Sequence, residues 1–372
     1  MNKVMSGKDV FVIADNVYTQ LGKTTAENFS NLKQNLSAVK QHCDYCAALF
    51  GNKDLNGDTA YTKFEQLLIA SIADALKQGN IDVANKNTVL IISSTKGNIS
   101  LLETEENSPG LQERIALSTS AKLVAKHFGF ISPPIIISNA CVSGVVAIIT
   151  ATRLLRTGQY ATAVVAGADV ISEFVLSGFR SFQALSPAVC RPFDKSRDGL
   201  NLGEGAGTII LSSDKKHEGN IKVLGGGISN DANHISGPSR TGQELAFAIN
   251  TSLKDAGVSA GNIDFISAHG TATVYNDEME ASAIGAAGLQ NVPLNSLKGY
   301  YGHTLGAAGL IESIISIQSM KENLFLPTPG FKEGDVTRPV NVCTSPLSIS
   351  AKNILKTASG FGGCNAAVVF GE

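Results

Sequence analysis

Residues 134–158 read PIIISNACVSGVVAIITATRLLRTG and join two patterns at one corner. The isoleucines at 135–137 are β-branched and uninterrupted, which predicts a strand buried on both faces. Residues 142–156 are apolar on almost every face, and Gly158 lies where a helix often ends, so we expect a buried helix here. Cys141 lies between the two, at a strand-to-helix corner typical of α/β folds.

The position of Cys141 predicts a reactive thiol. The first N–H groups of the helix and the positive end of its dipole lie beside this residue, which lowers a thiol pKa and favours the nucleophilic thiolate. The alternative is a small buried cysteine that only fills space in the core. The rest of the chain favours the reactive interpretation.

The other elements alternate in the same way, which indicates α/β layers with a largely parallel sheet. Residues 37–62 and 94–110 are expected to be loop-rich, and the polar stretch 214–220 divides the chain into halves at 1–215 and 216–372. Strands are expected at 9–14, 89–93, 161–166, 221–226, 263–268, 352–358 and 366–370, and helices at 24–36, 64–76, 111–128, 243–256, 277–287 and 307–320.

Composition excludes several classes of function. The 372 residues include 30 Lys and Arg against 32 Asp and Glu, and this net charge of −2 gives no support to nucleic-acid binding. No run approaches the ~18 apolar residues of a membrane span. Six scattered cysteines fit a reducing cytoplasm. Cys43 and Cys46 form a single C-x-x-C pair, which we expect to be structural rather than a metal site.

Two histidines lie in corners flanked by glycine in the second half of the chain. His269 ends the strand pattern IDFISAH, and His303 stands in KGYYGHTLGAAG ahead of a helix, with Lys298 five residues earlier. Open α/β folds place catalysis at the carboxyl ends of strands, so both histidines are candidate catalytic residues. A lone histidine would more often be structural.

Four motifs carry a family resemblance. These are NACVSG (139–144), HGTATVYNDEMEA (269–281), LKGYYGHTLGAAGLIES (297–313) and SGFGGCN (359–365), and the loop RPFDKSRDGLNLGEGAG (191–207) fits the same set. Together they resemble the elongating β-ketoacyl-acyl-carrier-protein synthases of the thiolase superfamily. The resemblance implies a thiolase fold, in which two similar halves form a five-layered αβαβα sandwich.

The resemblance also implies a decarboxylative Claisen condensation in two stages. Cys141 matches the nucleophile that takes an acyl group from a carrier-protein thioester. His269 and His303 match the pair that binds the malonyl thioester carbonyl and promotes the loss of carbon dioxide. The chemistry is consistent with these roles, because decarboxylation builds negative charge on the thioester oxygen and two N–H donors stabilise it.

Further residues match supporting positions of the family. Lys298 would hold the histidine network, with Glu312 as its acidic partner, since a glutamate in an apolar helix requires one. The Phe361 N–H would join that of Cys141 as an oxyanion hole. Asp277 and Glu280 would be supporting acids, Thr271 and Thr273 would bind the phosphopantetheine arm, and Phe179 would form a wall of the acyl pocket.

The resemblance also suggests the partners of the protein, and this sequence differs from the family pattern at two positions. We expect no cofactor or metal of the protein's own, since the substrate arrives on the phosphopantetheine of an acyl carrier protein. We expect a homodimer, or a heterodimer with a related subunit, in which strand 161–166 pairs with its counterpart at a two-fold axis. Gly299 stands where serine is common, and Gln183 where a docking arginine often lies.

Two other functions remain open from the sequence. A thiolase proper also has a second cysteine in a C-terminal glycine loop, where Cys364 stands, although the HGTAT histidine and the Lys298 pattern count against it. A chain-length-factor-like partner subunit keeps the fold and loses the nucleophile, which this chain retains. The pathway, fatty-acid elongation or polyketide and aryl-polyene synthesis, is not decided by these residues.

Overall fold

The computed structural model describes residues 8–42, 44–51, 55, 60–233 and 235–372, so Cys43 of the C-x-x-C pair lies outside the described residues. Strands from the first half of the chain form one part of the main sheet, in the order β1-β8-β6-β4-β5. These strands are β1 (Phe11–Tyr18), β4 (Thr88–Ser93), β5 (Ile135–Ile137), β6 (Thr162–Asp169) and β8 (Gly205–Ser212).

Strands from the second half form the other part, in the order β13-β11-β10-β15-β16-β9. They are β9 (Lys222–Asn230), β10 (Phe265–Ser267), β11 (Pro293–Asn295), β13 (Asn341–Val342), β15 (Asn353–Gly360) and β16 (Cys364–Gly371). The two parts meet where β1 pairs with β9 at Phe11 and Lys222. The expected boundary at residues 215 and 216 falls between β8 and β9, in the short helix η1 (Lys215–His217).

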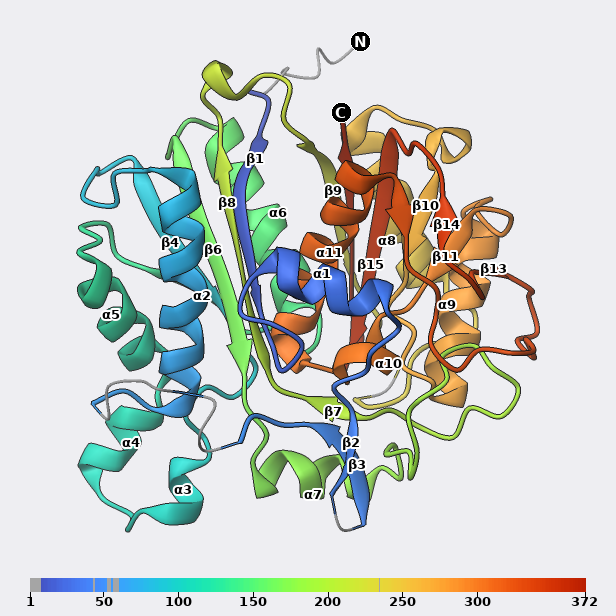
Figure 1. The fold of residues 1–372 in the computed structure, drawn as a ribbon, viewed down its shortest axis with the longest axis horizontal. Helices are drawn as coiled ribbons and strands as arrows, with labels where there is room; N and C mark the ends of the chain where they lie inside the picture. Colours follow the sequence, from blue (N-terminus) through green and yellow to red (C-terminus); the bar gives the residue numbers. More distant parts are fainter. Residues whose placement is uncertain (1–7, 43, 52–54, 56–59, 234) are drawn as a thin grey trace.

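Helices pack on both faces of each sheet part and produce five layers (Figure 1). The helices α2 (Lys63–Gly79) and α5 (Leu117–Phe128) cover the outer face of the first part. In the middle layer α6 (Ser143–Arg156) packs against α11 (Ala308–Glu322), and both contact the two sheet parts. The helices α8 (Gln243–Ala256) and α9 (Val274–Ala286) cover the outer face of the second part. This arrangement is the expected αβαβα sandwich.

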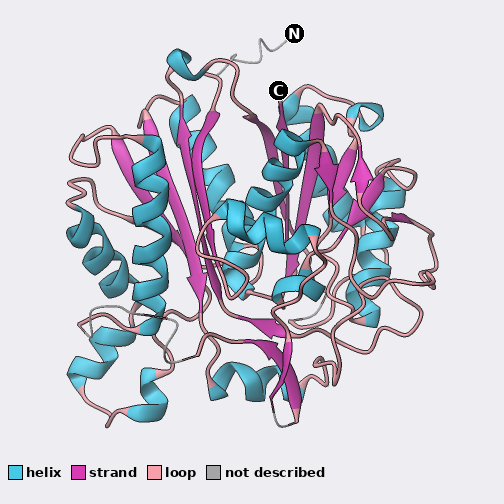
Figure 2. Ribbon diagram, in the orientation of Figure 1, coloured by secondary structure: helices cyan, strands magenta, loops and turns pink. Residues whose placement is uncertain are grey.

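A small second sheet lies below the main sheet in the view of Figure 2. A three-stranded sheet joins β2 (Lys40–His42), β3 (Tyr45–Ala48) and β7 (Leu202–Gly203), so the prediction of an irregular loop over 37–62 missed a hairpin. The remaining elements are α1 (Thr25–Lys33), α3 (Leu101–Thr104), α4 (Pro109–Ile115), α7 (Glu173–Ser181), η2 (Ala260–Asn262), α10 (Lys298–Tyr301), η3 (Leu305–Ala307), β12 (Leu324–Phe325) and β14 (Leu347–Ser348).

Local signals explain where the helices begin. Thr24 caps α1 by accepting a hydrogen bond from the Glu27 N–H, and Thr62 forms a capping box with Glu65 at the start of α2. The helix expected over 111–128 is instead two helices, because Ala116 adopts an extended conformation between α4 and α5.

The sheet is mixed, so the prediction of a largely parallel sheet is wrong. Strands β4, β5 and β6 pair in parallel, as do β10, β11 and β15, but β8 is antiparallel to both of its neighbours. Strand β16 is likewise antiparallel to both of its neighbours, β15 and β9. Hairpin connections such as the glycine turn between β15 and β16 permit antiparallel pairing without a crossover helix.

The predicted positions of β5 and β6 in the sheet are both wrong. Strand β5 is half-buried rather than buried on both faces, because it lies at one end of the sheet and, in the part of the chain that the structure describes, pairs only with β4. Strand β6 lies between β4 and β8, so the expected pairing of residues 161–166 with a symmetry mate is wrong. In the described sheet β5 is one of the two terminal strands, with β13 at the other end, so the edge of β5 is one that a second subunit could pair with.

Candidate active site

One cavity of about 540 Å³ brings together residues that the sequence places far apart. Cys141 follows the carboxyl end of β5, His269 follows β10, and Phe361 follows β15. His303 lies in the loop between α10 and η3. The side chains of all four residues line this cavity. Parallel strands place their carboxyl ends at one edge of a sheet, which is why elements so distant in sequence converge there.

Cys141 occupies the expected corner, but its acidity differs from the expectation. The residue is 7% exposed, and burial raises the pKa of its thiol to about 12, although the Lys298 ammonium and a hydrogen bond from the Phe361 N–H oppose this shift. A helix N-terminus stabilises a nearby anion by only about 0.3–2 kcal/mol. The prediction of a lowered thiol pKa is therefore wrong, because desolvation outweighs the helix end.

His269 and His303 meet edge to face, with ring centroids 5.2 Å apart. Burial, with the positive charge of Lys298 and Lys356, lowers the pKa of both imidazoles well below its ordinary value. Both rings are therefore neutral at physiological pH. Among the residues that the structure describes, Nδ1 of His303 has no hydrogen-bond partner. The pair can direct N–H groups at an oxygen inside the cavity.

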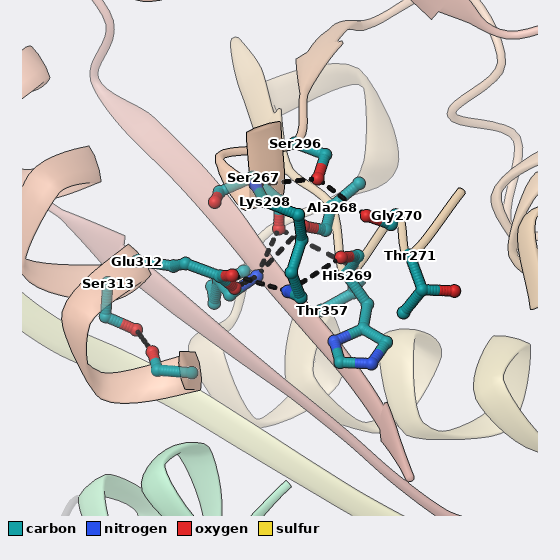
Figure 3. Close-up of polar contacts among 12 residues, drawn as sticks. Ser267, Ala268, His269, Gly270, Thr271, Ser296, Lys298, Glu312, Ser313 and Thr357 are labelled. Atoms are coloured by element: carbon teal, nitrogen blue, oxygen red, sulfur yellow. Dashed lines mark hydrogen bonds and ion pairs between the residues drawn. The ribbon is translucent and has the colours of Figure 1, made fainter. Parts of the chain in front are cut away.

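A polar cluster lies behind the His269 ring (Figure 3). The fully buried Lys298 donates from Nζ to the main-chain oxygen of His269 at 2.9 Å and to Oε1 of Glu312 at 2.5 Å. Glu312 comes from the apolar helix α11, and its expected ion pair with Lys298 is present. The His269 ring projects away from these contacts (Figure 3).

Asp277 and Glu280 hold the main chain beside His269 from the buried face of α9. Glu280 accepts the N–H groups of His269 and Gly270 at 2.8 and 2.7 Å. Asp277 accepts those of Thr271 and Phe193 at 3.0 and 2.7 Å, and burial raises the pKa of Asp277 to about 7. Both carboxylates thus orient the histidine loop without entering the cavity lining.

The expected substrate-binding residues also line the cavity. Thr271 and Thr273 lie with their hydroxyl oxygens 2.9 Å apart. The Phe179 ring stacks on Phe361 at 5.5 Å, and Phe182 meets Phe361 edge to face at 5.2 Å. Three rings therefore form an apolar wall beside Cys141, suited to contact with an acyl chain.

The sequence interpretation missed two buried charged residues. Lys356 lies in β15 with its side chain fully buried, and its Nζ lies 2.7 Å from Oε2 of Glu312. Asp169 ends β6 and accepts hydrogen bonds from Ser94, Thr95 and the Gly306 N–H; burial raises its pKa to about 6. The available signal was the same at both positions, a single charged residue within or ending an apolar strand.

The departures from the family pattern have visible consequences. A Cβ on Gly299 would lie 2.8 Å from Cβ of Pro329, so a serine does not fit there without displacement. Gln183 lies at the cavity lining. Cys364 does not line the cavity, and its thiol donates to Oδ1 of Asn139 at 2.7 Å. Cys364 is thus poorly placed to act as the second cysteine of a thiolase.

Known proteins show the same sequence pattern. The family model for the N-terminal domain of β-ketoacyl synthases matches residues 3–217, and that for the C-terminal domain matches residues 221–332. The chain is 31% identical over 338 residues to 3-oxoacyl-[acyl-carrier-protein] synthase 2 of Vibrio cholerae, covering 82% of each chain. Within the described residues, no helix is long and apolar enough to cross a membrane.

Solved structures show the same architecture. A β-ketoacyl synthase from Burkholderia phymatum superposes with a TM-score of 0.89 at 25% identity, covering 98% of this chain and 99% of that one. A ketosynthase in complex with its chain length factor from Xenorhabdus doucetiae gives a TM-score of 0.83 at 26% identity, covering 100% of both chains. The chain belongs to the β-ketoacyl synthase family and is an acyltransferase of the ketosynthase type.

Proposed function

We propose that the protein elongates acyl chains by condensing an acyl thioester with a malonyl thioester, both presented on the phosphopantetheine arm of an acyl carrier protein. The convergence of Cys141, His269 and His303 on one cavity carries this proposal. The similarity to 3-oxoacyl-[acyl-carrier-protein] synthase 2 of Vibrio cholerae supports the choice of carrier. Because the arm itself brings the reacting groups, the protein requires no cofactor of its own.

In the first stage Cys141 attacks the acyl thioester. The new bond joins Sγ to the acyl carbon, the bond to the pantetheine sulfur breaks, and the thiol proton ends on the released pantetheine. The Phe361 N–H donates to the Cys141 sulfur, so it would lie beside the carbonyl of a thioester bound there. Together with the Cys141 N–H it forms the pair of donors that an oxyanion requires.

In the second stage the malonyl thioester loses carbon dioxide. The electrons of the broken bond form an enolate, whose oxygen accepts hydrogen bonds from His269 and His303. Its carbon attacks the acyl group on Cys141, and the cysteine leaves as a thiolate that regains a proton. Neutral imidazoles suit this role, because an imidazolium would pair with the malonyl carboxylate and stabilise the ground state.

A paired measurement tests the two stages. Cys141→Ala should abolish acylation and condensation but retain carbon dioxide release from malonyl-carrier protein. His303→Ala should still accept an acyl group on Cys141 but lose decarboxylation by about 10²-fold or more, the usual cost of removing one such donor. Intact mass and labelled carbon dioxide are measured for each variant. The proposal fails if Cys141 accepts no acyl group, or if His303→Ala decarboxylates normally.

The partners follow from the same proposal. The unpaired edge of β5 supports a dimer, in which the second subunit is another copy or a related chain like the chain length factor of the Xenorhabdus doucetiae complex. The five cysteines in the described part of the chain are free, which supports a reducing compartment such as the cytoplasm.

A further inference from the structure

A second buried lysine lies beside the proposed catalytic histidines. Lys356 is the fourth residue of β15 and follows Ile354 and Leu355, which are fully buried. The Lys356 side chain is also 0% exposed. A buried ammonium is costly unless it is paired and fully hydrogen-bonded, so its contacts must compensate for lost water.

The Lys356 ammonium makes two hydrogen bonds and one ion pair. Its Nζ donates to the main-chain oxygens of Ser267 and Ala268 at 3.2 and 3.1 Å and lies 2.7 Å from Oε2 of Glu312. Lys298 donates to the next oxygen, that of His269, and to the other carboxylate oxygen of Glu312. Two ammonium groups bridged by one carboxylate therefore bind three consecutive carbonyls at the end of β10.

The same backbone segment is held from its other side. Glu280 accepts the N–H groups of His269 and Gly270, and it also accepts the Thr357 hydroxyl at 2.7 Å. Lys356 and Thr357 are neighbours in β15, so this strand contributes to both sides of the clamp. Two lysines and two glutamates balance in charge around the main chain that carries His269.

We propose that Lys356 is a positioning residue for the condensation: its ammonium fixes the strand end that carries His269 and repels protons from the His269 and His303 rings. This inference rests on the proposed function. Lys356 touches neither ring in a hydrogen bond, so it acts through the backbone and through its charge. Glu312 pairs with both Lys298 and Lys356, so its carboxylate reduces the net positive charge beside the rings.

The charges around the rings support this role. Burial and then the positive charge of Lys298 lower the pKa of both rings; His303 and then Lys356 lower that of His269 further, and Lys356 lowers that of His303. Glu312 from α11 and Glu280 from α9 are the carboxylates that face Lys356. Removing one of the lysine charges should therefore allow the rings to protonate at a higher pH.

A charge cycle tests the proposal. Lys356→Met removes one positive charge at nearly constant shape, Glu312→Gln removes one negative charge, and the double variant restores the balance. Ring resonances of ¹³C-labelled histidine are titrated in each protein, with His269 and His303 assigned through His269→Gln and His303→Gln. Lys356→Met should raise both ring pKa values by on the order of one pH unit, as expected for loss of a nearby unit charge. In the double variant the two histidine rings should titrate as in the wild type. In Glu312→Gln both rings should stay neutral over the whole pH range measured.

Two further variants separate charge from structure. Lys356→Gln has no charge but retains an amide donor, so it should shift the titration as Lys356→Met does and carries the test if the methionine variant does not fold. Lys321→Met removes an exposed α11 lysine that pairs with Asp15 at 3.1 Å, and the ring titration should not change. A Lys356 variant that folds and titrates like the wild type overturns the proposal.

An activity measurement follows the same variants. Lys356→Met should lose decarboxylation at acidic pH more than at pH 8, because protonated rings hold the malonyl carboxylate. A merely structural lysine would lower the activity equally at all pH values, which would also overturn the proposal. The titration does not require turnover, so it remains informative even if wild-type Cys141 accepts no acyl group and the proposed function fails.

Discussion

At Cys141 two physical effects act in opposite directions on one sulfur. The N-terminus of α6 and the Phe361 N–H favour the thiolate, whereas burial disfavours it and dominates. Such a site protects the nucleophile from solution electrophiles. The same donors act most strongly when negative charge develops on a bound thioester, which is where stabilisation accelerates the reaction.

The first prediction concerns the pH dependence of Cys141 alkylation. Because the thiol pKa is raised to about 12, the thiolate fraction at pH 7–9 is small and grows with pH up to that value. The rate of alkylation by iodoacetamide, followed by mass spectrometry with peptide mapping, should still rise at pH 10. A plateau near pH 7 would show instead that the helix end outweighs burial.

At the scale of elements, the two helices that carry the site touch through glycines. A Cβ on Gly144 of α6 would lie 2.6 Å from the main-chain nitrogen of Leu310, and one on Gly309 of α11 would lie 2.6 Å from Cγ2 of Val145. This contact fixes the Cys141 helix against the helix that supplies Glu312. The two glycines therefore set the distance between Cys141 and the cluster of Lys298 and Glu312 that supports the histidines.

The second prediction is that Gly144→Ala loosens this contact. The new methyl group meets backbone, so the free energy of unfolding should fall by about 1–3 kcal/mol, as for other overpacked cores, and decarboxylation should fall with it. Gly178→Ala in α7 is the matched control, because among the described residues no atom beyond its chain neighbours and its own helix backbone lies within 4 Å of the added Cβ. Urea denaturation compares the two. Equal stability of Gly144→Ala and the wild type would contradict the packing argument.

At the scale of the whole molecule, the two halves share one interior. The central helices α6 and α11 come from different halves and pack in the same apolar cluster with strands from both. The cavity forms where the carboxyl ends of strands from both halves meet. Among the described strands one edge of β5 is unpaired, shortly before the nucleophile in sequence, so a subunit that pairs there would lie beside the site.

The third prediction is dimerisation through β5. An unpaired strand edge beside half-buried isoleucines favours association with another strand. Light scattering should give a dimer at micromolar concentration, and hydrogen exchange should show protected amides in residues 135–137. A stable monomer with rapid exchange in β5 would contradict a homodimer and favour association with a different subunit.

The sequence by itself determined the local structure and the identity of the site. The isoleucines at 135–137 and the apolar run after Cys141 each act through neighbours a few residues away, so their effect can be recognised from the sequence alone. The motifs around Cys141 and His269 likewise identified the residues that line the cavity. Only the assembled strands and helices decided whether these residues meet.

Only the tertiary structure decided which strand lies at the end of the sheet, how burial shifts the Cys141 pKa, and that Lys356 pairs with Glu312. A run of isoleucines does not specify whether its strand is central or at an edge, so β5 and β6 were assigned the wrong way round. Desolvation depends on every element packed around an atom, which is why the Cys141 pKa rises against the local prediction. Lys356 and Glu312 lie 44 positions apart in sequence, and only the packing of β15 against α11 pairs them.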